Sequence, residues 1–244
     1  MGEVFFIASG KGGTGKSSVS SCLGTALAQQ NQRTILVDMD FGLRSLDIML
    51  GVQDTVLYNL YDVLDGRCAL ADAVLPAAFS QNLFLLSACQ SADLTVDVRK
   101  LEALIETLKN DYDFVLLDGG AGLGYSFRVA AKCAHRALLV VTPDPICVRD
   151  VTRAAQLLTE EGFDWQRLII NKVSPGIFKK NVLTNLDEVI DKTGVQLIGV
   201  VPNDPTIMHC TSKGMPLTPG SLSEKVFSRI AGRLGGQEID LLIK

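Results

Sequence analysis

A glycine-rich loop near the start of the chain constrains the possible fold more than any other feature. Residues 10–18 match the pattern G-x-x-x-x-G-K-[ST]. The apolar run Val4–Ala8 precedes this loop, and the helix-like segment Ser17–Gln30 follows it. In the order strand, loop, helix, the loop N–H groups and the start of the helix can wrap a phosphate. The sequence therefore predicts a phosphate-binding loop.

The side chains of this loop have separate expected roles. Lys16 would place its ammonium on the β- and γ-phosphates of a nucleotide, and the Ser17 hydroxyl would bind Mg²⁺. Lys11 is a second lysine that a phosphate loop does not need. The alternative to a functional role is that Lys11 is a solvated charge at the tip of the loop. The nucleotide-binding residues predicted in the loop are Gly10, Lys11, Gly12, Gly13, Thr14, Gly15, Lys16, Ser17 and Ser18.

The length and composition of the chain fit one globular domain. Its 244 residues, 47% hydrophobic and 20% charged, are enough for one large α/β domain with a sizeable core. A net charge of −4 and the lack of a long basic run give no reason to expect nucleic acid. Six scattered cysteines without a C-x-x-C motif indicate reduced thiols in the cytosol.

Short apolar runs alternate with helix-length segments along the whole chain. The runs are continuous, which is typical of strands covered on both faces, and repeated strand–helix units predict a doubly wound, mostly parallel sheet in one α/β domain over residues 1–235. Further strands are expected at Thr34–Val37, Leu83–Leu86, Phe114–Leu117, Ala137–Val141, Leu168–Ile170 and Leu197–Val201. Further helices are expected at Val98–Asn110 after an Asp97 N-cap, Tyr125–Cys133, Ile146–Glu161, Asn181–Lys192, and from a Ser223 N-cap to Leu234.

Three aspartates follow predicted strands at the sheet edge where the loops gather. Asp38 and Asp40 follow the second strand, and Asp118 follows Phe114–Leu117. Asp118 would hold Mg²⁺ through a water molecule, together with Ser17. Asp40 would place an attacking water, and Asp38 would brace the phosphate loop or bind one of its lysines. The alternatives are an N-capping role for Asp118 and a pair of solvated loop acids.

The loop resembles the deviant phosphate loop of the MinD/ParA family of ATPases, which carries an extra lysine in the position of Lys11. The stretch Val37–Asp47 is similar to the switch I pattern D-x-D-x-G-L-R-N-L-D of this family. Tyr58–Cys68 is similar to the family segment that follows switch I. The similarity extends from near residue 3 to near residue 235.

This resemblance implies a P-loop NTPase that binds ATP with Mg²⁺ and forms an ATP-dependent homodimer. It implies that Lys11 reaches the nucleotide of the partner subunit, that Asp40 is the hydrolytic aspartate, and that Lys11, Lys16 and Asp40 are catalytic. It also implies an adenine pocket formed by Asn171 with Pro202, Asn203 and Asp204. Asparagine and aspartate can pair with an adenine edge, although Asn171 alone is equally well a turn residue after a strand.

The MinD branch of the family implies a switch whose ATP dimer recruits partners of the MinC and MinE type to place the division septum. Arg149 and Asp150 match the helix where such partners bind. The alternatives are a MinD-like regulator of flagellar number or other cargo, a DNA-coating partition ATPase, a small-molecule transferase or ligase, and a metal-cluster carrier. Weak basic content opposes the partition role, and the absence of suitably spaced cysteines opposes the cluster carrier. The two histidines, His135 and His209, read as surface or packing residues.

The sequence departs from the family at three places. Gly119 and Gly120 stand where the family has Ser or Cys and then Pro, which would loosen that segment, and Lys172 replaces the usual Arg. Residues 236–244 form a short tail with one lysine and two acids. So short a segment is a marginal helix and lacks the basic and aromatic faces of a membrane anchor. We therefore expect no membrane-targeting helix there and a cytoplasmic protein, with a peripheral position at the inner face of the cell membrane as the alternative.

Overall fold

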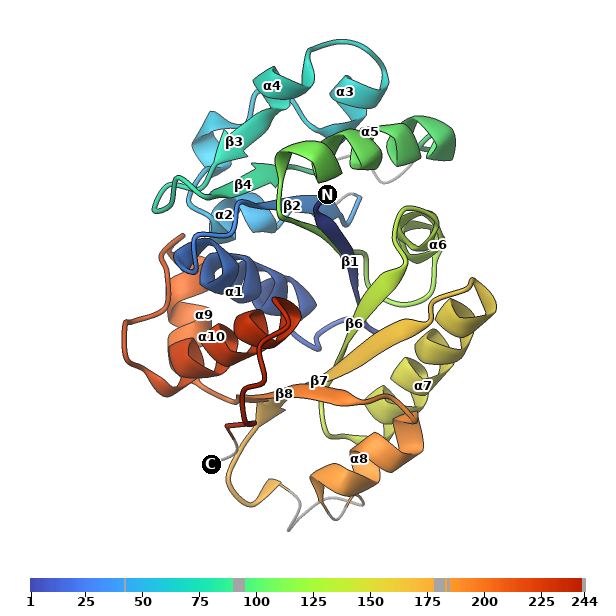
Figure 1. The fold of residues 1–244 in the computed structure, drawn as a ribbon, viewed down its shortest axis with the longest axis vertical. Coiled ribbons are helices and arrows are strands. Elements are labelled where there is room, and N and C mark those ends of the chain that lie inside the picture. Colours follow the sequence, from blue (N-terminus) through green and yellow to red (C-terminus); the bar gives the residue numbers. More distant parts are fainter. Residues whose placement is uncertain (42, 90–94, 178–182, 184, 243–244) are drawn as a thin grey trace.

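The computed structural model describes residues 1–41, 43–89, 95–177, 183 and 185–242 as one sheet with helices on both faces (Figure 1). The strands are β1 (Glu3–Ala8), β2 (Thr34–Met39), β3 (Val74–Pro76), β4 (Leu83–Leu86), β5 (Phe114–Gly119), β6 (Arg136–Val141), β7 (Trp165–Val173) and β8 (Leu197–Pro202). The longer helices are α1 (Lys16–Gln29), α5 (Val98–Asp111), α6 (Tyr125–Lys132), α7 (Pro145–Glu160), α8 (Leu186–Thr193), α9 (Pro205–Ser212) and α10 (Leu222–Leu234). The short ones are α2 (Leu46–Met49), the 3-10 turn η1 (Gln53–Thr55), α3 (Leu60–Leu64) and α4 (Leu70–Ala73).

The order of the strands places the glycine-rich loop at the centre of one edge of the sheet. The order is β3-β4-β2-β5-β1-β6-β7-β8, and every neighbouring pair is parallel except β3 with β4. From β1 the chain builds the sheet first toward β2 and later, from β6 onward, on the other side of β1. Ligands bind beyond the carboxyl ends of strands at such a reversal. The predicted mostly parallel α/β fold is confirmed, and the antiparallel edge strand β3 was not predicted.

Both faces of the sheet are buried under helices, which explains why the strands read as continuous apolar runs. Every residue of β2 and of β5 is buried. Adjacent side chains of a strand point to opposite faces, and accordingly Phe5 and Phe6 of β1 belong to different core clusters. Helices α1, α9 and α10 cover one face, and α5, α6 and α7 cover the other (Figure 1).

The predicted bounds of α1, α5, α6 and α7 differ from the observed bounds by at most one residue. The predicted N-cap Asp97 is confirmed, since it accepts hydrogen bonds from Arg99 N and Lys100 N at the start of α5. The Ser223 N-cap is wrong. Helix α10 is capped by Ser221, which accepts from Glu224 N. Ser223 lies buried in the first turn and donates to Asp204 Oδ2 at 2.6 Å. The predicted helix Asn181–Lys192 is seen as α8, and its predicted start at Asn181 lies outside the described residues.

The segment between β2 and β4 and helix α9 were not predicted. Helices of four or five residues are too short to show a helical period, and they form here because they pack on the core. Helix α9 had a local signal that we missed, since Asp204 accepts from Thr206 N and Pro205 takes the first helical position. The same Asp-Pro start appears at α7 with Asp144 and Pro145.

The described part of the C-terminal tail lies against α10. Arg233 Nε donates to Ile239 O at 2.7 Å, and Arg229 Nη1 donates to Asp240 O at 3.0 Å. Leu242 packs against the apolar cluster on that face of the sheet. Among the described residues, no helix has the length and apolar character needed to cross a bilayer. The division into residues 1–235 and a tail of 236–244 remains a prediction.

Candidate functional site

The glycine-rich loop connects β1 to α1 and lines a cleft of about 230 Å³. Gly15 is the N-cap of α1 with φ 84°, a left-handed conformation that favours glycine. A Cβ at Gly15 would lie 2.5 Å from Asn171 Nδ2, so only glycine fits at this point of the loop. Asp40, Met49 and Ala121 line the other walls. The structure therefore brings Asp40 to the loop, as the sequence predicts.

Lys16 and Asp118 form a buried ion pair at the base of the cleft. Lys16 Nζ lies 2.9 Å from Asp118 Oδ1 and donates to Ser17 Oγ at 3.4 Å. Ser20 Oγ donates to the same carboxylate oxygen at 2.7 Å. Ser20 was not predicted as a site residue, although it lies one helical turn after Lys16 and therefore on the same face of α1. The three residues predicted for the phosphates and the metal thus lie together.

Asp38 and Asp40 differ in burial, and the pKa of each carboxyl group is raised. Asp38 is fully buried, and its Oδ1 accepts a hydrogen bond from Asp40 N at 3.0 Å. It therefore braces the segment that follows β2 rather than the phosphate loop, and the loop lysine Lys16 pairs with Asp118 instead. Burial, with a further contribution from the charge of Asp118, raises the pKa of Asp38 to about 7. Burial also raises the pKa of Asp40, and the Lys16 ammonium opposes that rise.

Three buried oxygen atoms at this site have no hydrogen-bond partner. They are Thr14 Oγ1, Asp38 Oδ2 and Asp118 Oδ2, and the only other such side-chain atom among the described residues is Gln166 Oε1. Buried polar atoms are normally paired, so their clustering indicates a place built for a ligand. Carboxylate and hydroxyl oxygens suit Mg²⁺, which binds through one or two protein groups plus water and phosphate. These residues therefore fit the metal site predicted at Ser17 and Asp118.

Replacing Asp38 with asparagine should stabilise the nucleotide-free chain at high pH. The folded chain holds the Asp38 proton more tightly than the unfolded chain, whose pKa is near 3.8. The contribution of Asp38 to the free energy of unfolding therefore falls as the pH rises from about 4 to about 7. At pH 8, Asp38→Asn should be more stable than the wild type by about 4 kcal/mol, which corresponds to the rise of the Asp38 pKa from 3.8 to about 7. Urea denaturation between pH 5 and pH 8 measures it, and an equal difference at both ends would contradict the assignment.

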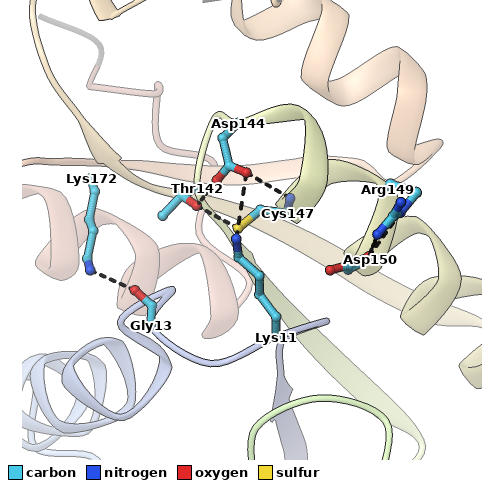
Figure 2. Close-up of polar contacts among 8 residues, drawn as sticks. All are labelled: Lys11, Gly13, Thr142, Asp144, Cys147, Arg149, Asp150 and Lys172. Carbon is cyan, nitrogen blue, oxygen red and sulfur yellow. Dashed lines mark hydrogen bonds and ion pairs between the residues drawn. The ribbon is translucent and has the colours of Figure 1, made fainter.

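Lys11 leaves the loop in a different direction from Lys16. Its Nζ lies 3.8 Å from Oδ1 of Asp144, which is the N-cap of α7, and Figure 2 shows the end of the Lys11 side chain next to the Cys147 sulfur. A hydrogen bond with the Cys147 thiol, followed by the charges of Asp144 and Asp150, raises the pKa of Lys11. Thr142 Oγ1 donates to Asp144 Oδ2 at 2.7 Å and so fixes this carboxylate. The sequence did not predict that Lys11 contacts α7.

The residues predicted for the adenine pocket lie at the same edge of the sheet as the phosphate loop, and their side chains make hydrogen bonds within the protein. Asn171 is buried in β7, and its Nδ2 donates to Thr14 O at 2.8 Å. Pro202 ends β8 beside the end of β7. Asp204 accepts from Thr206 N and Ser223 Oγ, and although burial opposes it, these hydrogen bonds lower its pKa. Contact of these residues with adenine remains a prediction.

The predicted partner-binding residues lie on α7, close to the loop. Arg149 is 77% exposed, and its Nη2 lies 3.0 Å from Asp150 Oδ1 (Figure 2). The loop packs directly against this helix, since a Cβ at Gly10 would lie 2.3 Å from the carbonyl carbon of Asp150. A partner on α7 would therefore sit beside the phosphate loop. The partner role of Arg149 and Asp150 remains a prediction.

A buried lysine in a glycine-rich loop, at the carboxyl end of a central parallel strand and next to strand-end aspartates, defines the class of P-loop nucleotide-binding proteins. Residues 5–217 match the family described as the CobQ/CobB/MinD/ParA nucleotide binding domain. The chain belongs to this MinD/ParA family of ATPases.

Relatives and solved structures of MinD proteins resemble the chain over nearly its whole length. The septum site-determining protein MinD of a Synechocystis species is 35% identical over 249 residues, which cover 99% of this chain and 92% of that protein. The MinC:MinD cell division protein complex of Aquifex aeolicus matches with a TM-score of 0.91 and 31% identity, covering 99% of this chain and 98% of that chain. The Pyrococcus horikoshii MinD complexed with Mg-ADP matches with a TM-score of 0.86 and 31% identity, covering 96% of each chain.

Proposed function

We propose that this protein is an ATP-timed switch that dimerises on ATP and recruits partners that place the division septum. The observation that carries the proposal is that the two lysines of the phosphate loop differ in burial and direction. Lys16 lies buried in the cleft beside Asp118, whereas the Lys11 side chain is 39% exposed at the rim and points along the surface toward α7. An exposed lysine at that place is available to a nucleotide held by a second copy of the chain.

The cleft holds the triphosphate through backbone N–H groups of residues 10–18 and through Lys16. The Lys16 ammonium lies between Asp118 and Ser17, so a small movement toward the loop brings it to the phosphates. Asp118 keeps Ser20 as a hydrogen-bond donor when Lys16 leaves it. Ser17 and, through water, Asp118 would hold Mg²⁺, which when bound offsets the charge of the phosphates. Asn171, Pro202 and Asp204 would face the base. The Mg-ADP bound to the Pyrococcus horikoshii relative supports this placement.

Hydrolysis transfers the terminal phosphoryl group of ATP to water, and ADP is the leaving group. Asp40 lines the cleft opposite the loop, and its carboxylate orients the attacking water and accepts its hydrogen bond. Lys16, together with Lys11 of the other copy, offsets the negative charge that spreads over the phosphoryl oxygens. Loss of the terminal phosphate removes the group that Lys11 holds, so the two copies separate.

Dimer formation and partner binding are coupled through α7. Lys11 must leave Asp144 to reach the other copy, and Asp144 is the residue that caps α7. The same helix carries Arg149 and Asp150, whose neighbourhood forms a shallow groove with Arg153 and Lys192. The Aquifex aeolicus relative is solved as a complex with MinC, which supports a partner of that type. A partner of the MinE type rests on the family resemblance alone.

Nucleotide-dependent dimerisation of wild type and Lys11→Ala tests this proposal. Light scattering after size-exclusion chromatography should show a wild-type dimer with Mg²⁺ and a non-hydrolysable ATP analogue, and a monomer with ADP. Lys11→Ala should remain a monomer under both conditions, because the contact to the second nucleotide is lost.

Calorimetry supplies the control, since Lys11→Ala should still bind the analogue at its own site. Lys225→Ala removes an exposed lysine of α10 and should dimerise like the wild type. A Lys11→Ala chain that dimerises as strongly as the wild type would refute the role of Lys11 between subunits.

A further inference from the structure

Two consecutive residues at the end of β7 donate hydrogen bonds to two consecutive carbonyl groups of the phosphate loop. Asn171 Nδ2 donates to Thr14 O at 2.8 Å. Lys172 Nζ donates to Gly13 O at 2.7 Å, as Figure 2 shows. Lys172 is otherwise exposed to solvent, and it was noted in the sequence only as a departure from the usual arginine.

The backbone of β7 is distorted, and this distortion allows both side chains to reach the loop. In a regular strand, neighbouring side chains point to opposite faces, so residues 171 and 172 could not both reach one loop. Lys172 has φ 59°, and the β7–β8 register is shifted between Ile170 and Val173. Among the described non-glycine residues, only Asn31 shares this left-handed conformation. Such strain in a lysine persists where the surrounding structure or a function requires it.

Because of the geometry of the peptide bond, these hydrogen bonds to two carbonyl groups also fix the direction of the N–H groups that follow them. In a trans peptide, the C=O of one residue and the N–H of the next point in opposite directions. Holding Gly13 O and Thr14 O toward β7 therefore turns the N–H groups of Thr14 and Gly15 away from β7, toward the cleft. The hydrogen bonds among the described residues include none donated by these two N–H groups. A positively charged donor on Gly13 O also polarises that peptide unit and strengthens its N–H group as a donor.

We propose that Lys172 is a positioning residue that, together with Asn171, sets the phosphate loop in the conformation that binds phosphate. Lys172 acts on the loop from outside, since it is not among the residues that line the cleft. This inference rests on the proposed nucleotide site and adds to it a residue outside the loop motif.

The test compares MgADP affinity by calorimetry in wild type and three variants. Lys172→Met keeps the length of the side chain but removes the donor, and should weaken binding about tenfold, as expected for loss of one hydrogen bond from a charged group. Lys172→Arg keeps a charged donor and should bind within about threefold of the wild type. Lys225→Met removes one exposed positive charge of α10 that does not line the cleft, and it should leave the affinity unchanged.

A fourth variant, Lys172→Gly, separates positioning from general stability. Glycine adopts a positive φ freely, so the melting temperature without nucleotide should equal or exceed that of the wild type. Its MgADP affinity should nevertheless fall as in Lys172→Met. A purely structural role of Lys172 would lower both quantities together.

The outcomes distinguish this inference from the function on which it rests. Wild-type affinity in Lys172→Met and Lys172→Gly would overturn the positioning role and leave the nucleotide site intact. Equal weakening in Lys172→Met and Lys172→Arg would show that the hydrogen bond to Gly13 is not what matters. A wild-type chain that binds no MgADP would remove the proposed function itself.

Discussion

Replacing Lys16 with alanine should lower the affinity for ATP and ADP by about 10²–10³-fold, because a buried charge that the phosphates require is lost. Lys16 is the cation at the base of the cleft, and its side chain is only 6% exposed. Solvent cannot replace it at that depth. Calorimetry with MgADP and MgATP measures the effect. A Lys16→Ala chain with near wild-type affinity would mean that the loop does not bind the phosphates.

The same substitution should also destabilise the nucleotide-free chain. Asp118 is fully buried, and without Lys16 its charge keeps only the Ser20 hydroxyl as a donor. Removing one partner of a buried ion pair costs about 3–5 kcal/mol. The double variant Lys16→Ala with Asp118→Asn should regain most of this stability without regaining ATP binding. If the double variant recovers binding instead, the loss in Lys16→Ala comes from unfolding and not from a missing phosphate contact.

Replacing Asp40 with alanine should slow ATP hydrolysis by about 10²–10⁴-fold, the range typical of a lost catalytic acid or base. The ATP affinity should change little, because Asp40 faces the loop across the cleft and belongs neither to the loop nor to its ion pair. The ATP dimer should therefore persist, so that light scattering finds a stable dimer with ordinary MgATP. Single-turnover hydrolysis measures the rate.

Asp54 offers a matched control for this variant. It is an exposed aspartate of the 3-10 turn η1, and Asp54→Ala should hydrolyse ATP at the wild-type rate. Fast hydrolysis by Asp40→Ala would assign the water to another group, and Asp38 would be the first to examine because it contacts Asp40 N.

The loop, the central strands and the long helices could be predicted because their signals are local. Glycine spacing identifies the loop, and continuous apolar runs identify strands buried on both faces. The position of Asp118 next to the phosphate loop also followed, because parallel strands end at one edge. Its ion pair with Lys16 was not predicted. Where two capping signals compete within three residues, as for Ser221 and Ser223, the sequence does not decide which serine caps the helix.

Contacts between distant residues could not be predicted in the same way. Ser20 meets Asp118 across 98 positions, and Lys172 meets Gly13 across 159. Lys172 has a left-handed backbone that the sequence does not indicate, since lysine rarely adopts it. The short helices between β2 and β4 depend on packing rather than on their own periodicity.

A crystal structure with Mg²⁺ and a non-hydrolysable ATP analogue would show whether Lys11 joins two copies of the chain through their nucleotides. We expect two copies facing each other, with Lys11 Nζ released from Asp144 and about 2.8 Å from a phosphate oxygen of the partner's nucleotide. A structure with the analogue bound, in which Lys11 still lies on Asp144 of its own chain and contacts no other subunit, would contradict it.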